Sequence, residues 1–170
     1  MKTIFFILIS ISNFAQSRYD TNNLTPFVGH WEWINGNETF KVEIYIEGGY
    51  LKGHYCLVET NNGFIINTIY ESNKLLNANL NFYFGSAIFG GSQDGVLFHA
   101  SIEDNVLLGT GPNDYKRTKQ GSLAFTITND GNNGQPITAT WRVKILQGLK
   151  STEEPSSFSI PTDIVLTKVD

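Results

Sequence analysis

The chain has 170 residues, a length that suits one domain. Only 16% of its residues are charged, against about 25% in typical soluble domains, and the formal net charge is -4. This acidic balance argues against a nucleic-acid-binding protein, because such proteins normally carry a basic face. The basic run Lys116–Lys119 is isolated, and we interpret it as a solvated loop.

Residues Met1–Gln16 have the pattern of a secretory signal peptide. Lys2 supplies the positive charge, Ile4–Ile11 is predominantly apolar, and Ala15 is a small residue at the expected cleavage point. The segment is too short to span a bilayer, and no other segment has the length of a transmembrane helix. We therefore expect an exported protein, periplasmic or extracellular, with one folded domain over residues 24–170.

The segments between the turn signals alternate between apolar and polar residues. In one of them, Phe40, Val42 and Ile44 share a face, and Lys41 and Glu43 share the other. A period of two is typical of half-buried antiparallel strands. The turn signals, which favour tight hairpins, are Asn35-Gly36, Gly48-Gly49, Asn62-Gly63, Asp94-Gly95, Asp130-Gly131 and Asn133-Gly134. Strands are expected over residues 29–34, 39–46, 50–59, 64–70, 87–89, 96–103, 106–111, 122–128, 136–146 and 163–169.

This succession of short strands and tight turns predicts an all-β fold. Hairpin after hairpin favours an up-and-down meander, and closure of the sheet removes its exposed edges. We therefore expect an antiparallel up-and-down β-barrel of about 8–10 strands. A short helical turn is expected near residues 26–29 or 72–77, and residues 147–159 are expected to form a polar loop before the last strand.

Two short stretches carry a family resemblance. The run Phe27-Val28-Gly29-His30-Trp31 and the late run Leu166-Thr167-Lys168-Val169 resemble the calycin group, which includes lipocalins, fatty-acid-binding proteins and avidins. Members of that group carry Gly-x-Trp on the first strand and a cation on or just after the last strand. The resemblance implies that Gly29 and Trp31 form the signature and that Lys168 packs across the indole, closing one end of a barrel.

The avidin version of the pattern is the nearest in this chain. Gly53-His54-Tyr55 resembles part of the first avidin hairpin, and Thr140-Trp141-Arg142 resembles a later strand, so the match places Tyr55 at the pocket tyrosine. Trp33 stands where avidins carry an asparagine, so the resemblance does not extend to biotin binding. The whole chain also resembles a set of small exported bacterial proteins of unknown function, and this likeness covers most of the mature chain.

The apolar strand faces provide the candidate ligand-binding residues Trp33, Tyr55, Phe125 and Trp141. Small barrels are either filled by side chains or hold one small ligand, and periodicity does not separate the two. One hypothesis is therefore an exported lipocalin-like barrel that binds a small apolar or amphipathic ligand non-covalently. The alternative is a solid barrel scaffold whose outer surface binds a protein or cell-envelope partner, with the aromatic stretch Asn79–Phe89 as its patch.

Catalytic and metal-binding patterns are missing from the sequence. His30, His54 and His99 fall on different expected strands and have no metal-ligand spacing. No Gly-x-Ser-x-Gly elbow and no paired carboxylates are present, so we expect no enzyme, no metal and no cofactor. The only cysteine, Cys56, is interpreted as a small buried apolar side chain. The alternative interpretation, in which His54 activates Cys56 from the same strand face, stays open.

Overall fold

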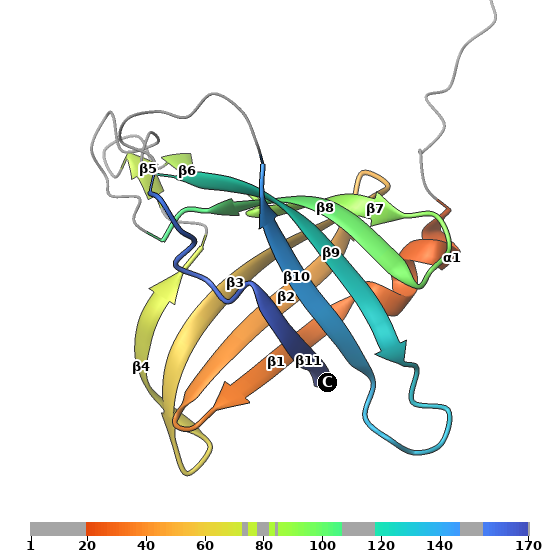
Figure 1. Cartoon of the computed structure of the whole chain (residues 1–170), viewed down its shortest axis with the longest axis horizontal. Coiled ribbons are helices and arrows are strands. Elements are labelled where there is room, and N and C mark those ends of the chain that lie inside the picture. Colours follow the sequence, from red (N-terminus) through yellow and green to blue (C-terminus); the bar gives the residue numbers. More distant parts are fainter. Residues whose placement is uncertain are drawn as a thin grey trace, which may run out of the picture.

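The computed structural model describes residues 20–72, 75–77, 82–83, 85–106, 118–146 and 155–169. These residues form one short helix, one 3-10 helix and a series of antiparallel strands (Figure 1). The elements are α1 (Thr21–Leu24), η1 (Thr25–Phe27), β1 (Gly29–Asn35), β2 (Glu38–Glu47), β3 (Tyr50–Asn61), β4 (Phe64–Glu71), β5 (Leu75–Asn77), β6 (Phe82–Tyr83), β7 (Ile88–Ser92), β8 (Leu97–Asp104), β9 (Lys119–Asn129), β10 (Thr138–Ile145) and β11 (Asp163–Val169).

Eight of the described strands close into an antiparallel barrel. The sheet order is β2-β1-β11-β10-β9-β8-β7-β3, and a further pairing of β2 with β3 completes the ring. Most strands that are neighbours in the ring are also consecutive along the chain. The two exceptions are the pair β1 and β11, the first and last strands, and the pair β3 and β7. The predicted all-β, up-and-down β-barrel is therefore confirmed, and the closed ring has eight strands.

β3 is long enough to pair with two different strands along one of its edges. Its first residues, Leu51–Gly53, pair with β7, whereas Cys56–Asn61 pair with β4. A two-residue turn joins β3 to β4, and Asn62 (φ 51°) and Gly63 (φ 80°) both adopt the positive φ that such a turn needs. β4 therefore lies at the end of the sheet order, outside the closed ring.

The expected strands lie close to their predicted bounds wherever the structure describes them. Residues 107–117 lie outside the described part of the chain, so the expected strand over 106–111 is not tested there. The helical turn expected near 26–29 is present as η1. The alternative place for this turn, 72–77, is not helical in its described residues, because Leu75–Asn77 pairs with β6 as strand β5.

The barrel interior holds one hydrophobic cluster built from the predicted inward faces. Its buried members are Leu24, Phe27, Trp31, Phe40, Val42, Ile44, Leu51, Tyr55, Ala87, Ile88, Phe98, Ile102, Val106, Leu123, Phe125, Ala139, Trp141, Val143, Ile160 and Leu166. Most of these side chains come from alternate strand positions, as the period of two predicts. Their burial supplies the main driving force for folding, about 1.5–3 kcal/mol for each large apolar side chain.

The N-terminal helices close one end of the barrel. Asp20 caps α1 by accepting a hydrogen bond from the Asn22 amide, and Leu24 and Phe27 are completely buried. The Phe27 ring packs 5.6 Å from Phe98, measured between centroids. Within the described residues, no helix is long and apolar enough to cross a membrane.

Candidate functional site

The Gly-x-Trp signature lies at the end of the barrel that η1 covers. The Trp31 Nε1 donates a hydrogen bond to the Phe27 carbonyl at 2.9 Å, and the indole is completely buried. The Lys168 Nζ lies 5.4 Å from the centre of the Trp31 ring and donates to the Pro26 carbonyl at 3.1 Å. The contact between Trp31 and Lys168 that the calycin resemblance implies is therefore present, and it ties the last strand to the first.

Gly29 is required by this arrangement for two reasons. Its φ of +128° lies where side-chain-bearing residues are strained, and a Cβ there would lie 3.0 Å from the Lys168 Cε. The absence of a side chain lets the lysine stem lie directly against the backbone.

The predicted ligand-binding residues lie in and against the core. Phe125 and Trp141 are completely buried, Tyr55 is 3% exposed, and Trp33 packs partly buried against the same cluster. Phe40 connects them, because its ring lies 5.9 Å from Tyr55 and 5.5 Å from Trp141, and Trp33 is its neighbour in the β1–β2 register. Phe125 joins the group through Trp141, at 6.3 Å between ring centroids, so the rings of the four residues fill interior space.

The polar atoms of these aromatic residues have protein partners. The Tyr55 hydroxyl donates to the Glu103 carbonyl at 2.8 Å and accepts from the Asn105 backbone N–H at 3.2 Å. Burial raises the pKa of Tyr55 far above its ordinary value, so the hydroxyl stays protonated. The Trp141 Nε1 donates to the Pro161 carbonyl at 2.8 Å.

A buried polar cluster, which the sequence did not indicate, lies where β8 ends and β9 begins. Asp104 is 4% exposed, and Asn105 and Lys119 are completely buried. Asp104 accepts a hydrogen bond from the Ser159 amide, and the Lys119 Nζ donates to the Pro155 carbonyl at 2.8 Å. These contacts hold residues 155–160 across this end of the barrel.

Lys119 corrects the expectation of a solvated basic loop over Lys116–Lys119. Its ammonium lies 5.5 Å from the centre of the Phe158 ring, so it has both a carbonyl and an aromatic partner in place of water. Lys116 and Arg117 lie outside the described residues.

Asn105 is the one buried residue in the described part of the chain whose side-chain nitrogen and oxygen both have no hydrogen-bond partner. An unsatisfied buried amide costs free energy unless water or a ligand pairs with it.

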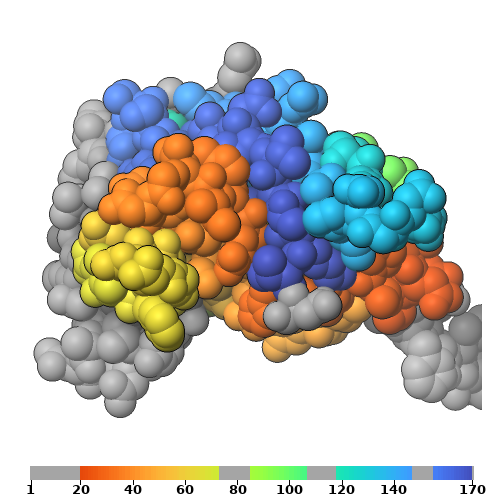
Figure 2. Space-filling view, turned by 90° about the horizontal axis from the view of Figure 1, so that it is seen from below, coloured from red at the N-terminus to blue at the C-terminus, as the bar shows by residue number. Residues whose placement is uncertain are grey.

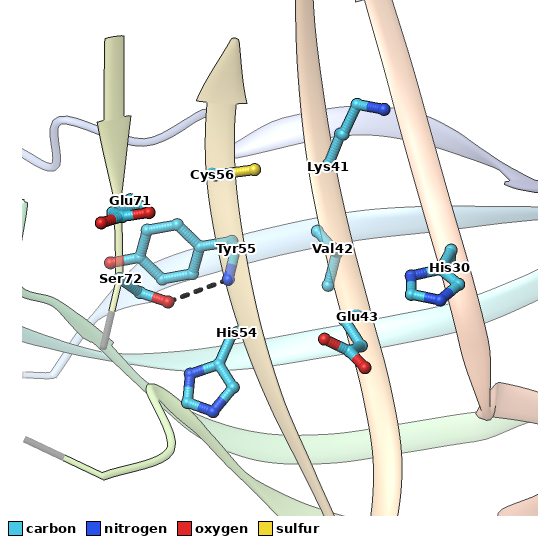
Figure 3. Close-up of a pocket in the computed structure, with 9 residues that line it drawn as sticks. All are labelled: His30, Lys41, Val42, Glu43, His54, Tyr55, Cys56, Glu71 and Ser72. Atoms are coloured by element: carbon cyan, nitrogen blue, oxygen red, sulfur yellow. Dashed lines mark hydrogen bonds between the residues drawn. The ribbon is translucent and has the colours of Figure 1, made fainter. Parts of the chain in front are cut away.

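The outer wall of the barrel carries a hollow of about 340 Å³ between β1, β2, β3 and the end of β4 (Figure 3). It brings together His30, Lys41, Glu43, His54, Cys56 and Glu71. Both histidines flank Glu43 in the sheet register, whereas His99 lines a different hollow. Among the described residues, no group of three His, Cys, Asp or Glu side chains is placed to hold a metal ion.

Cys56 and His54 do share this outer face, but the geometry gives no activated thiol. Cys56 is half-buried on the outer wall, so the expectation of a core side chain is wrong, since the strand alternation points it away from the cluster. Burial raises the pKa of the Cys56 thiol and lowers the pKa of His54. Both groups are therefore neutral near pH 7, and the His54 Nε2 instead lies 3.2 Å from the Tyr45 hydroxyl.

Four of the ten exposed large apolar side chains in the described part of the chain lie on β4. The exposed fractions are 76% for Phe64, 55% for Ile65, 59% for Ile66 and 43% for Ile69. We call these four side chains the β4 surface. In Figure 2 the hairpin that carries them, drawn in yellow, projects beside the orange β1–β2 hairpin. The sequence predicted the strand but not its exposure, because an apolar run without alternation is typical of a strand buried on both faces.

The patch predicted at Asn79–Phe89 is described only in part. Phe82–Tyr83 forms β6, and residues 79–81 and 84 lie outside the described part. Ala87 and Ile88 are buried in the core. Phe89 is 43% exposed and stacks 4.9 Å from Tyr50. Among residues 85–89, Phe89 is therefore the exposed large apolar one.

Comparison with known proteins gives a family without an assigned activity. No curated protein and no solved structure matches the chain. The match that covers the chain, over residues 1–169, is to a family described as a family of unknown function, DUF6705. The chain, an eight-stranded antiparallel barrel, therefore belongs to the family of unknown function DUF6705.

Proposed function

We propose that this protein is a non-catalytic binding module, in which the packed barrel is a scaffold and the β4 surface receives a protein partner. The single observation that carries the proposal is the exposure of the four large apolar side chains on one strand outside the ring. Phe64, Ile65 and Ile66 are consecutive in the strand, so the exposed side chains lie on both sides of β4. Exposed apolar surface of this extent on soluble proteins marks interaction sites. The barrel supplies a rigid base, since β3 belongs both to the closed ring and to the β3–β4 hairpin.

A site-specific crosslink tests this function. A photoreactive amino acid replaces Phe64 in the full chain, and a matched control places it at Val165, which is 52% exposed on β11. Both proteins are expressed in the cells that make the natural chain, irradiated and analysed by mass spectrometry. We expect a defined crosslinked protein at position 64 and none of it at position 165. The same crosslinks at both positions would refute a specific β4 surface.

The proposed place of action is outside the cytoplasm, periplasmic or extracellular, and this rests on the signal pattern of Met1–Gln16. N-terminal sequencing of the protein recovered from the periplasm or the medium checks it. We expect a first residue shortly after Ala15. Recovery of the intact chain from the cytoplasm alone would contradict export.

A second candidate function, binding of a small apolar or amphipathic ligand, is favoured by Asn105. Its side-chain amide is buried without a partner, while its backbone N–H donates to the Tyr55 hydroxyl, and a polar head group would satisfy both side-chain amide atoms. Native mass spectrometry and displacement of a lipophilic dye test this candidate. A bound mass lost in Asn105→Leu would support it. A chain that carries only water and binds no dye would refute it.

A further inference from the structure

The segment Phe64–Tyr70 of β4 has a sequence that reads nearly the same in both directions. Its order is aromatic, aliphatic, aliphatic, Asn67, Thr68, aliphatic, aromatic, and it contains no charged residue. If two copies of the segment run antiparallel about Asn67, Phe64 lies opposite Tyr70 and Ile65 lies opposite Ile69. Each aromatic or aliphatic residue, apart from Ile66 opposite Thr68, then meets a residue of its own kind.

Such a self-matching pattern is what a two-fold interface needs. In an isologous contact the same patch is present on both subunits, so residue i meets j and j meets i. The neutral segment also suits a like-charged pair, because each chain carries a formal charge of -4 and approach through uncharged residues minimises repulsion. A different protein partner would require no such internal symmetry.

We infer that the partner of the β4 surface is a second copy of this chain, docked antiparallel with Asn67 on the two-fold axis. The inference rests on the proposed function and names its partner. The β3–β4 register shifts between Leu57 and Val58 and again between Glu59 and Thr60, because Ile69 and Ile66 of β4 have no partner residue on β3. Such bulges interrupt a regular ladder, so apolar side-chain contact contributes more than backbone hydrogen bonds.

The size of the β4 surface sets the expected affinity. The four side chains expose on the order of 400 Å² in each copy, which is typical of a functional patch on a monomer. Two such patches bury less than the roughly 1,200 Å² at which stable interfaces begin, so the dimer is expected to be weak.

Sedimentation velocity of the purified full chain between micromolar and millimolar concentration tests the inference. We expect a monomer–dimer equilibrium that Ile66→Lys shifts at least tenfold towards monomer, because it places like charges in the interface. Val165→Lys adds the same charge at an exposed aliphatic residue on β11 and leaves the equilibrium unchanged. Equal effects of both variants, or a monomer throughout, would overturn the inference.

An engineered disulfide between two copies of the chain tests the proposed antiparallel register of β4. In a Cys56→Ser background, Asn67→Cys places two thiols opposite each other across the axis, at the Cα separation that disulfides accept. We expect a covalent dimer under mild oxidation from Asn67→Cys, and far less from Val165→Cys. Equal crosslinking would contradict the proposed register. A strictly monomeric chain that still gives the position-64 crosslink to another protein would refute the second copy and leave the proposed function intact.

Discussion

Truncation of Trp31 measures how much the contacts of this side chain contribute to the free energy of unfolding. The indole is completely buried, packs edge-on against Phe125 at 4.9 Å and lies under the Lys168 ammonium. Removal of a buried tryptophan side chain costs about 3–5 kcal/mol. Loss of Nε1 also leaves the Phe27 carbonyl without its partner, at about 1–3 kcal/mol. We expect Trp31→Ala to lose about 4 kcal/mol or more, a large part of the 5–15 kcal/mol that stabilises a typical domain.

A graded series keeps the measurement possible if Trp31→Ala does not fold. Trp31→Phe keeps an aromatic ring and removes the Nε1 donor, so we expect a smaller loss of about 2 kcal/mol. Ile34→Ala, on the same strand at 67% exposure, is the control and should change stability by less than about 0.5 kcal/mol. Equilibrium urea unfolding, followed by far-ultraviolet circular dichroism, gives all three values. A loss below about 1 kcal/mol for Trp31→Ala would refute the reasoning.

Three further predictions concern single residues. Gly29→Ala should destabilise by about 1–3 kcal/mol in the same assay, because the positive φ and the Lys168 stem both oppose a Cβ; an unchanged midpoint would contradict this. Tyr55→Phe leaves two buried backbone groups unpaired and should cost about 1–3 kcal/mol, whereas a neutral result would mean that water replaces the hydroxyl. Cys56 should react with iodoacetamide more slowly than a free thiol at pH 7, because its raised pKa leaves less thiolate at that pH. The reaction should become faster as the pH rises towards this pKa, and mass spectrometry of the alkylated chain follows the rate. A rate equal to that of free cysteine at pH 7 would contradict the burial.

The barrel could be predicted from the sequence because strand alternation and turn residues depend only on neighbouring residues. The alternation along β2 and β10 follows from the pleat of each strand, and the Asn62-Gly63 turn follows from the φ values that these residues tolerate. The Gly-x-Trp resemblance added a long-range pair, Trp31 and Lys168, that no local pattern contains. Residues that fill a core and residues that line a cavity have the same alternating pattern, so the packing of Trp141 against Phe40 and Phe125 was not predictable.

What only the tertiary structure decided is which surfaces are covered. Lys119 belongs to a basic run in the sequence, but residues 155–160 fold over it and supply a carbonyl and a ring. Phe64–Tyr70 has the composition of a core strand, but β7 takes the place in the ring that β4 would otherwise fill, so β4 stays outside. The sequence by itself determined the strands, their turns and the inward faces, because these depend on neighbouring residues. Burial depends on segments far away in the chain, and the tertiary structure alone places those segments.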